Sequence, residues 1–320
     1  MDVSNLIEAL NPAQREAVCA ERGNYLILAG AGSGKTRVLT SRIAWLNQVF
    51  DVPLYRVLAV TFTNKAAAEM RSRIAQLLPE GSRGMWAGTF HGIAHRLLHL
   101  HWQEANLPEA FQVLDADDQL RMIKRVVQDL QLDDTRFPPK QLVWWINNHK
   151  DAGRRPSSIQ INMGDQFTRI QLQVYEEYEA RCQRSGLVDF AEILLRAHET
   201  LLKVPALLEH YQQRFSEILV DEFQDTNNVQ FAFIRLLAGQ HGCVFVVGDD
   251  DQSIYGWRGA QVENMQKFLR DYPNTQTIRL EQNYRSTGNI LAAANAVIAH
   301  NPERLGKKLW TEDRDGSLID

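Results

Sequence analysis

The segment Ala29–Thr36 is the clearest place in this sequence where residue types and their spacing predict chemistry. It reads Ala-Gly-Ala-Gly-Ser-Gly-Lys-Thr, with an apolar run before it and helix-forming residues after it. Spaced glycines let successive backbone N–H groups converge on an anion, and the helix that follows adds the positive end of its dipole. A flexible linker does not require this order of apolar run, glycines, Lys-Thr pair and helix. The segment therefore predicts a phosphate-binding loop.

Each position of this loop has an expected role. We expect Lys35 to reach the β- and γ-phosphates of a nucleotide and Thr36 to hold Mg²⁺. Ala29 stands where the usual pattern has its first glycine, so three later glycines must make the turn. The residues expected to cradle the phosphates are Ala29, Gly30, Ala31, Gly32, Ser33 and Gly34.

Two adjacent acids, Asp221 and Glu222, follow another apolar run that begins at Ile218. The carboxyl ends of parallel strands meet at one edge of a sheet, so these acids are expected beside the phosphate loop. We expect Asp221 to bind Mg²⁺, with Glu222 as a further candidate ligand. We also expect Glu222 to orient and deprotonate the attacking water. Adjacent acids at a strand end are common, so this interpretation depends on the phosphate loop.

A third apolar run, Cys243–Val247, leads into Gly-Asp-Asp-Asp-Gln252. Gln252 follows a strand end beside the same crevice, so we expect it to sense the γ-phosphate. The three acids of residues 249–251 could instead form a second metal cluster. We do not expect three consecutive side chains to face one ion, and the alternative stays open here.

The loop after Gln252 carries two aromatic residues, Tyr255 and Trp257, with Arg258 beside them. Aromatic faces stack on nucleic-acid bases whatever the base sequence, which suits binding to a single strand. We expect Tyr255 and Trp257 to stack on bases and Arg258 to lie near the backbone or phosphates. The alternative is a turn whose two aromatic side chains pack into the core.

Composition and charge limit the classes of protein that fit. The 320 residues are 44% hydrophobic and 23% charged, which is ordinary for a globular protein of about two domains. The net charge of -4 gives no whole-chain evidence for nucleic acid, so that prediction depends on local features. The three cysteines, Cys19, Cys182 and Cys243, are too few and too far apart for a disulfide framework. With no apolar run of about 18 residues, a cytoplasmic protein without a membrane segment is expected.

Strands and helices alternate at both ends of the chain, which is the pattern of an α/β fold with a parallel sheet. Tyr25–Ala29 and Val57–Phe62 are predicted strands, each followed by a helix, and Asn64 is the expected cap of the second helix. From His91 to about Arg214 the strand pattern gives way to helical periodicity, and it returns at Ser216. We therefore expect the α/β domain to be interrupted by an all-helical insert.

Six motifs, in this order, resemble those of the UvrD, Rep and PcrA family of superfamily one DNA helicases, with wording nearest to the UvrD members. Six ordered motifs are far more specific than any one of them. They are Ala29–Thr36, Thr61–Met70, Gly88–Gly92, Val220–Thr226, Val247–Gly259 and Gln282–Ser286.

The resemblance implies a RecA-like phosphate-loop domain and the start of a second one. The implied divisions are residues 1–90 and 215–280 for the first motor domain, 91–214 for the insert and 281–320 for the second. It also implies ATP and Mg²⁺ as cofactors and 3′ to 5′ translocation on single-stranded DNA. The implied roles are in nucleotide excision and mismatch repair, at duplex and single-strand junctions and with repair-protein partners.

The resemblance assigns roles that spacing alone does not reveal. It implies that Gln14 reads adenine, that Arg37 and Tyr284 flank the base, and that Arg285 reaches the γ-phosphate. An arginine in that role is typically worth ~10³ to 10⁵ in turnover. The implied catalytic residues are Lys35, Glu222, Gln252 and Arg285. The residues implied to contact DNA are Phe62, Asn64, His91, Phe190, Tyr255, Trp257 and Arg258.

The residue chemistry of Phe190 by itself favours another interpretation, because Phe190 lies between Leu187 and Ile193 and core packing is the commoner fate of such a residue. Two other patterns are not interpreted as sites. His91, His95 and His99 share a helix face, but no fourth zinc ligand is apparent. Trp144 and Trp145 point in different directions on a helix, so packing within the insert is expected.

Family members carry a complete second motor domain and a second insert, which this sequence does not contain. We therefore expect a piece that binds ATP and DNA but hydrolyses ATP poorly and unwinds duplexes poorly or not at all alone. Two alternatives remain: an ATP-gated DNA-binding module without turnover, and the helicase part of a helicase-nuclease subunit.

Overall fold

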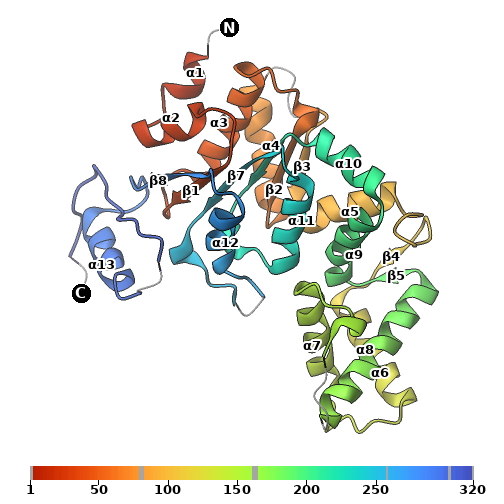
Figure 1. The fold of residues 1–320 in the computed structure, drawn as a ribbon. Coiled ribbons are helices and arrows are strands. Elements are labelled where there is room, and N and C mark those ends of the chain that lie inside the picture. Colours follow the sequence, from red (N-terminus) through yellow and green to blue (C-terminus); the bar gives the residue numbers. More distant parts are fainter. Residues whose placement is uncertain (1–2, 79–82, 161–164, 257–258, 302–303, 319–320) are drawn as a thin grey trace. The chain divides into compact units, whose positions relative to one another are not determined.

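The computed structural model describes residues 3–78, 83–160, 165–256, 259–301 and 304–318 (Figure 1). Its contacts separate the chain into two compact units. The sheet unit comprises residues 1–90, 209–226 and 234–320, and the helical unit comprises residues 91–208 and 227–233. The segment 281–320 belongs to the sheet unit, and the implied domain divisions stay predictions.

The sheet unit is built on a six-stranded sheet in which every ladder is parallel, so the α/β class with a parallel sheet is confirmed. The strand order is β3-β2-β6-β7-β1-β8. β1, β2 and β6 are wholly buried, as expected for apolar strands covered on both faces. The strands are β1 (Tyr25–Ala29), β2 (Val57–Thr61), β3 (Trp86–Thr89), β6 (Glu217–Val220), β7 (Cys243–Gly248) and β8 (Gln276–Leu280).

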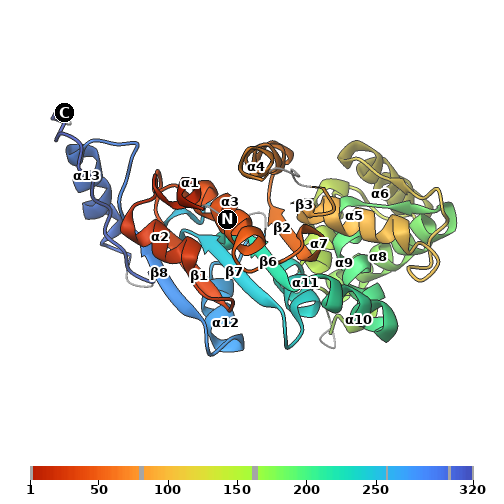
Figure 2. The ribbon, with the colours of Figure 1, turned by 90° about the horizontal axis from the view of Figure 1, so that it is seen from above.

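Helices cover both faces of this sheet, with α1 to α4 on one face and α12 on the other (Figure 2). The core between α3 and the sheet is apolar, and Ile43 and Ile27 are both fully buried in it. The helices wholly in this unit are α1 (Ser4–Ile7), α2 (Pro12–Cys19), α3 (Lys35–Gln48), α4 (Asn64–Leu77), α12 (Glu263–Asp271) and α13 (Gly288–Ile298). The connections among the described residues include short 3₁₀ turns, namely η1 (Leu54–Arg56), η3 (Phe223–Asp225) and η4 (Asp250–Gln252).

The helix starts follow side-chain capping. Asn11 caps α2, and Gln14 completes a reciprocal capping box with it. The expected cap of α4 was wrong by one residue: the Thr63 side chain accepts from the Ala66 N–H at 3.1 Å, and Asn64 is the first helical residue.

The helical unit contains α6 (Ala116–Asp129), α7 (Pro139–Asp151), η2 (Pro156–Ser158), α8 (Gln166–Ser185) and α9 (Phe190–Lys203). Apolar residues at helical spacing, including Ile123, Val127, Val174 and Tyr178, are buried in its core. The helical insert is confirmed with one correction to "all-helical": β4 (Gln112–Val113) and β5 (Leu187–Val188) form a short parallel ladder. Some helices have residues in both units, namely α5 (Phe90–Leu100), α10 (Pro205–Arg214) and α11 (Asn228–Ala238).

The segment after α12 returns to the sheet. β8 pairs with β1 along its whole length, and an isolated bridge joins Gln282 to Trp310 beyond it. None of the helices that the structure describes is long and apolar enough to cross a membrane.

Candidate nucleotide-binding site

The predicted loop and acids lie at the carboxyl edge of three adjacent strands, in the order β6, β7, β1 (Figure 2). The phosphate loop, residues 30–34, joins β1 to α3. Gly32 and Gly34 have φ values of +68° and +87°, which other residues adopt only with strain. A Cβ at Gly30 would lie 2.1 Å from Leu309 Cδ2, so close packing requires the third glycine.

Hydrogen bonds hold the carbonyl groups of four consecutive loop residues. The donors come from the loop itself, from α2 and from the segment after β8. The bonds are Ser33 Oγ to Gly30 (2.7 Å), Asn283 Nδ2 to Ala31 (2.5 Å), Tyr284 N to Gly32 (3.0 Å) and Gln14 Nε2 to Ser33 (2.7 Å).

Lys35 and Glu222 meet at this edge. The Lys35 ammonium lies 2.8 Å from Glu222 Oε2, and Gln224 Nε2 donates to the same oxygen at 2.9 Å. Glu222 has φ +50° and ψ 44°, a left-handed conformation that strains a non-glycine residue. Such strain clusters at functional sites because the surrounding structure must maintain it. The two residues predicted to act on the phosphates and the water are therefore in direct contact.

Carboxyl groups outnumber the ammonium at this edge. Burial, with a contribution from the Glu222 charge, raises the pKa of Asp221 to about 6. The same two causes raise the pKa of Asp225 to about 6. Asp225 Oδ1 is also buried without a hydrogen-bond partner among the described residues.

This group of oxygens fits Mg²⁺. Mg²⁺ prefers hard oxygen ligands and usually takes one or two protein carboxylates together with substrate phosphates. Asp221 supplies a buried carboxylate at the end of β6, and Thr36 supplies a hydroxyl in the first turn of α3. A divalent cation here would offset the like charges that raise the pKa of Asp221.

The residues that follow β7 show that one expectation was wrong. The carboxylates of Asp249, Asp250 and Asp251 do converge, with oxygen atoms within 4.8 Å of one another, because η4 turns the backbone there. Lys307 Nζ occupies the point of convergence, 2.5, 2.9 and 2.6 Å from the three carboxylates in turn. Gln252, expected to sense the γ-phosphate, donates its amide to Asp249 in this structure.

The residues assigned to the nucleotide base surround the outer side of the loop. The Gln14 side chain is buried and accepts from the Asn11 N–H at 3.1 Å while it donates to the loop. Tyr284 is exposed, and its hydroxyl accepts from Asn11 Nδ2 at 2.8 Å. Arg37 and Arg285 are also exposed, and Arg37 donates to the Ala9 carbonyl at 3.3 Å.

The residues implied to contact DNA divide between the two units. In the sheet unit, Phe62 packs edge-on against Phe90 with ring centroids 5.3 Å apart, and the side chains of Asn64 and Tyr255 are exposed. Trp257 and Arg258 lie outside the described residues, so their expected stacking and phosphate contacts stay predictions.

In the helical unit, His91 and Phe190 form a stacked pair with ring centroids 3.8 Å apart and an interplanar angle of 22°. Phe190 is 60% exposed, so the core packing favoured by its sequence neighbours was wrong. Burial lowers the pKa of His91 to about 4, which keeps the ring neutral near pH 7.

The two patterns left without a site role also have clear surroundings. His95 and His99 approach each other at 3.2 Å between Nε2 atoms, and both rings contact Phe111. Trp145 packs near Tyr175 as expected. Trp144 is 63% exposed, so the expected packing was wrong for that residue.

Sequence reasoning missed three residues that organise the site. Asn283 and Gln224 lie inside recognised motifs, where their neighbours drew the functional interpretation. Gln224 connects two strand ends, because it donates to Glu222 and accepts from the Asp249 N–H at 2.9 Å. Lys307 lies far from any motif, so no local signal could have found its contact with the acids of η4.

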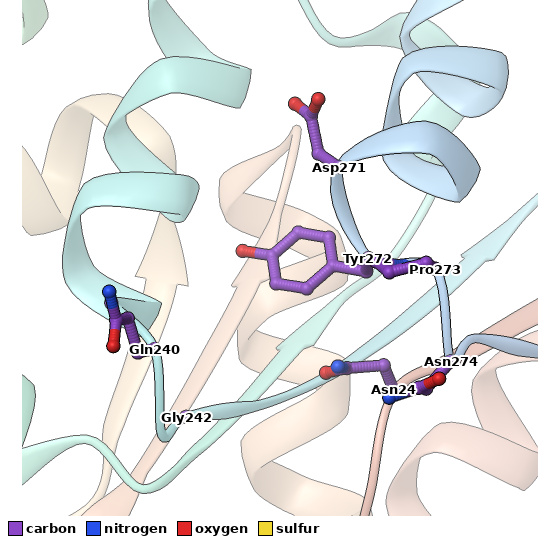
Figure 3. Close-up of a pocket in the computed structure, with 8 residues that line it drawn as sticks. Asn24, Gln240, Gly242, Asp271, Tyr272, Pro273 and Asn274 are labelled. Carbon is purple, nitrogen blue, oxygen red and sulfur yellow. The ribbon is translucent and has the colours of Figure 1, made fainter.

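A separate cavity of about 280 Å³ lies at the opposite, amino-terminal edge of the sheet (Figure 3). Asn24, Gly242 and Asn274, which precede β1, β7 and β8, are among its lining residues. It is therefore remote from the phosphate loop, which follows β1 at the other end of that strand.

Comparison with known proteins agrees with this geometry. Residues 10–273 match the family described as the UvrD/REP helicase N-terminal domain. The chain is 61% identical over 319 residues to DNA helicase II of Escherichia coli K12, covering 100% of this chain and 44% of that protein. It is 47% identical over 320 residues to ATP-dependent DNA helicase PcrA of Leuconostoc citreum, covering 100% of this chain and 43% of that protein. The chain thus spans less than half the length of these relatives.

Proposed function

The chain belongs to the UvrD/REP helicase family, and from this premise we propose that it is the ATP- and DNA-binding part of a 3′ to 5′ DNA helicase. Its reaction is hydrolysis of ATP, coupled to movement along single-stranded DNA. The relatives named DNA helicase II and ATP-dependent DNA helicase PcrA support this proposal. The observation that carries it is the contact between Lys35 and Glu222 beside the glycine loop.

Each group at the sheet edge has a task in this reaction. The loop N–H groups and Lys35 bind the phosphates, while Thr36 and Asp221 hold Mg²⁺. When bound, Mg²⁺ supplies charge neutralisation for the transferred phosphoryl group. Phosphate competes with Glu222 for the Lys35 ammonium, so nucleotide binding frees the Glu222 carboxylate to accept a proton from the attacking water.

The neighbouring residues bind the base and respond to the γ-phosphate. Gln14 retains one amide N–H for adenine, because its other groups bond Asn11 and the loop. Tyr284 and Arg37 flank the base, and Arg285 stabilises charge on the transferred phosphoryl group. Gln252 must leave Asp249 to reach the γ-phosphate.

The exposed rings support contact with DNA bases. Phe190, backed by His91, offers a free face for stacking, and Tyr255 is exposed on the loop after Gln252. A cytoplasmic role in nucleotide excision and mismatch repair, at duplex and single-strand junctions and with repair proteins, is proposed from the family.

We further propose that this 320-residue chain binds ATP and DNA but hydrolyses ATP slowly and does not unwind duplexes alone. The exposure of Tyr284 and Arg285 supports slow hydrolysis. Where these two side chains face solvent, few protein groups would enclose a bound nucleotide. An ATP-gated binding module without turnover is the second candidate. The ion pair between Lys35 and Glu222 favours it, because a Glu222 carboxylate held by Lys35 is not free to act as a base.

The substitution Glu222→Gln tests the proposal and separates the two candidates. Phosphate release with ATP, Mg²⁺ and single-stranded DNA is expected to fall at least ~100-fold while ATP binding persists, because a general base typically contributes 10²–10⁴. Glu104→Gln, at an exposed acid of the helical unit, is the matched control. Equal phosphate release by the parent chain and by Glu222→Gln would contradict the catalytic role. Rapid unwinding by the parent chain would contradict the proposal that this chain does not unwind duplexes alone.

A further inference from the structure

Asn283 is a buried residue that bonds the phosphate loop, and its effect on nucleotide binding has not been considered so far. We propose that Asn283 is a positioning residue for that loop: its amide holds the Ala31 carbonyl outward, so that loop N–H groups face the phosphates. The inference rests on the proposed function, because it deepens the assignment of the ATP site.

The orientation of the Asn283 amide follows from its partners. Its Oδ1 accepts from the backbone N–H groups of Arg285 at 2.8 Å and Ser286 at 2.7 Å. The oxygen is thereby committed to its own turn, so the nitrogen must face the loop, where Nδ2 lies 2.5 Å from the Ala31 carbonyl. The side chain is 2% exposed, which leaves water little chance to replace either bond.

The approach of this segment to the loop is close. The Tyr284 N–H donates to the Gly32 carbonyl at 3.0 Å. A Cβ at Gly32 would lie 2.8 Å from both Asn283 Nδ2 and Arg285 Cβ. Gly32 is therefore required by this contact as well as by its positive φ.

The direction of the carbonyl groups fixes the direction of the N–H groups. In a trans peptide unit the C=O of one residue and the N–H of the next point in opposite directions. Outward carbonyls at Ala31 and Ser33 therefore turn the N–H groups of Gly32 and Gly34 the other way. Within the described residues, these two N–H groups donate to no protein acceptor, as an anion-binding nest requires.

The same contact links two parts of the proposed active site. Asn283 stands directly before Tyr284 and Arg285, which are expected to meet the base and the γ-phosphate. Its bond to Ala31 therefore sets the position of that segment against the loop that binds the phosphates.

The test compares the affinities of ADP and AMP for the 320-residue chain carrying Asn283→Ser. Serine keeps an oxygen for the turn with Arg285 and Ser286 but cannot reach Ala31. Loss of the bond leaves the loop peptide free to turn, so ADP is expected to bind about tenfold more weakly. AMP affinity should change less than ADP affinity, because AMP offers this loop only an α-phosphate, whereas ADP offers both of the phosphates that the loop cradles.

Asn289→Ser is the matched control, since the Asn289 amide donates to the carbonyls of Gly316 and Ser317, outside the loop. It should leave both affinities unchanged. If Asn283→Ser does not fold, Asn283→Thr, which also keeps an oxygen and lacks the amide donor without adding charge, must weaken ADP binding more than AMP binding.

Equal weakening of ADP and AMP, or no weakening in a folded variant, would overturn the role of Asn283 alone. Failure of the unchanged chain to bind ADP would instead overturn the proposed function, and this inference with it.

Discussion

Two groups of charged side chains in this chain differ in how closely the number of cations matches the number of acids. At the carboxyl edge of the sheet, Asp221, Glu222 and Asp225 face the ammonium of Lys35, and the pKa values of Asp221 and Asp225 are raised. In the helical unit, Lys150 bonds Asp189 at 2.7 Å and lies 3.0 Å from Glu192.

The second group has three cations for four acids, which is closer to balance than the one cation for three acids at the sheet edge. Arg155 contacts Glu192, Glu179 and Glu199, and Arg196 also bonds Glu192. Although burial opposes it, the charges of Lys150 and Arg155 lower the pKa of Glu192. Two buried carboxyl groups, Asp221 and Glu192, thus have pKa values shifted in opposite directions by the charges nearby, while burial raises the pKa of Glu179 in spite of Arg155.

The difference indicates two functions for charge. The balanced group joins α7, α8 and α9, and Asp189 caps the helix whose first residue is Phe190. The unbalanced group is destabilising until a cation or a proton arrives, which is the property of a binding site.

The largest expected effect comes from removing a buried cation from the helical unit. Lys150→Met should destabilise it by about 3–5 kcal/mol, because buried carboxylates of Asp189 and Glu192 lose their partner. Hydrogen-exchange mass spectrometry of α7 and α9 measures the loss. Lys203→Met, at an exposed lysine 3.8 Å from Glu199, is the control and should cost less than about 1 kcal/mol. Similar protection in the two variants would remove the distinction between the groups.

The opposite result is expected at the sheet edge. Asp221→Asn should stabilise the metal-free chain by about 2 kcal/mol at pH 8, because it removes a buried, uncompensated charge. Since the folded pKa is raised to about 6, the ionised carboxylate lowers stability above that pH and has no such effect below the unfolded value. The gain should therefore fade as pH falls from about 6 to 4.

Urea unfolding in the presence of a metal chelator measures this gain. Asp134→Asn, at an exposed acid, should show no comparable effect. Destabilisation by Asp221→Asn at pH 8 would mean that the carboxylate is already compensated.

A smaller effect is expected at Phe190, the first residue of the helix that Asp189 caps. Phe190→Ala should weaken single-stranded DNA binding by about 1 kcal/mol, the lower end for a stacking ring, because His91 already covers one face. Fluorescence anisotropy with a labelled oligonucleotide measures the change. Phe167→Ala is a matched control, since Phe167 is 40% exposed and stacks on Phe137 in the same unit. Equal affinities for the two variants would contradict the stacking role.

The sequence predicted the features that depend on residues close together in the chain. The glycine loop, the parallel strands and the position of Asp221 and Glu222 beside that loop followed from spacing and from the shared edge of parallel strands. Two contacts did not follow. Asn283 reaches Ala31 across 252 positions, and Lys307 reaches Asp250 across 57, so only the folded chain brings them together.

The errors also have physical causes. The acids of residues 249–251 converge because a 3₁₀ turn overrides the divergence expected of consecutive side chains. Phe190 is exposed because it opens α9, where its ring stacks on His91 instead of entering the core.

The most direct test of the unbalanced group is calorimetric titration of ATP into the parent chain and into Asp221→Asn, each with and without Mg²⁺. The account predicts that Mg²⁺ strengthens ATP binding to the parent chain at least about tenfold and has little effect on Asp221→Asn, although that variant is the more stable protein. Equal enhancement by Mg²⁺ in both proteins would contradict the assignment of this edge as a metal–nucleotide site.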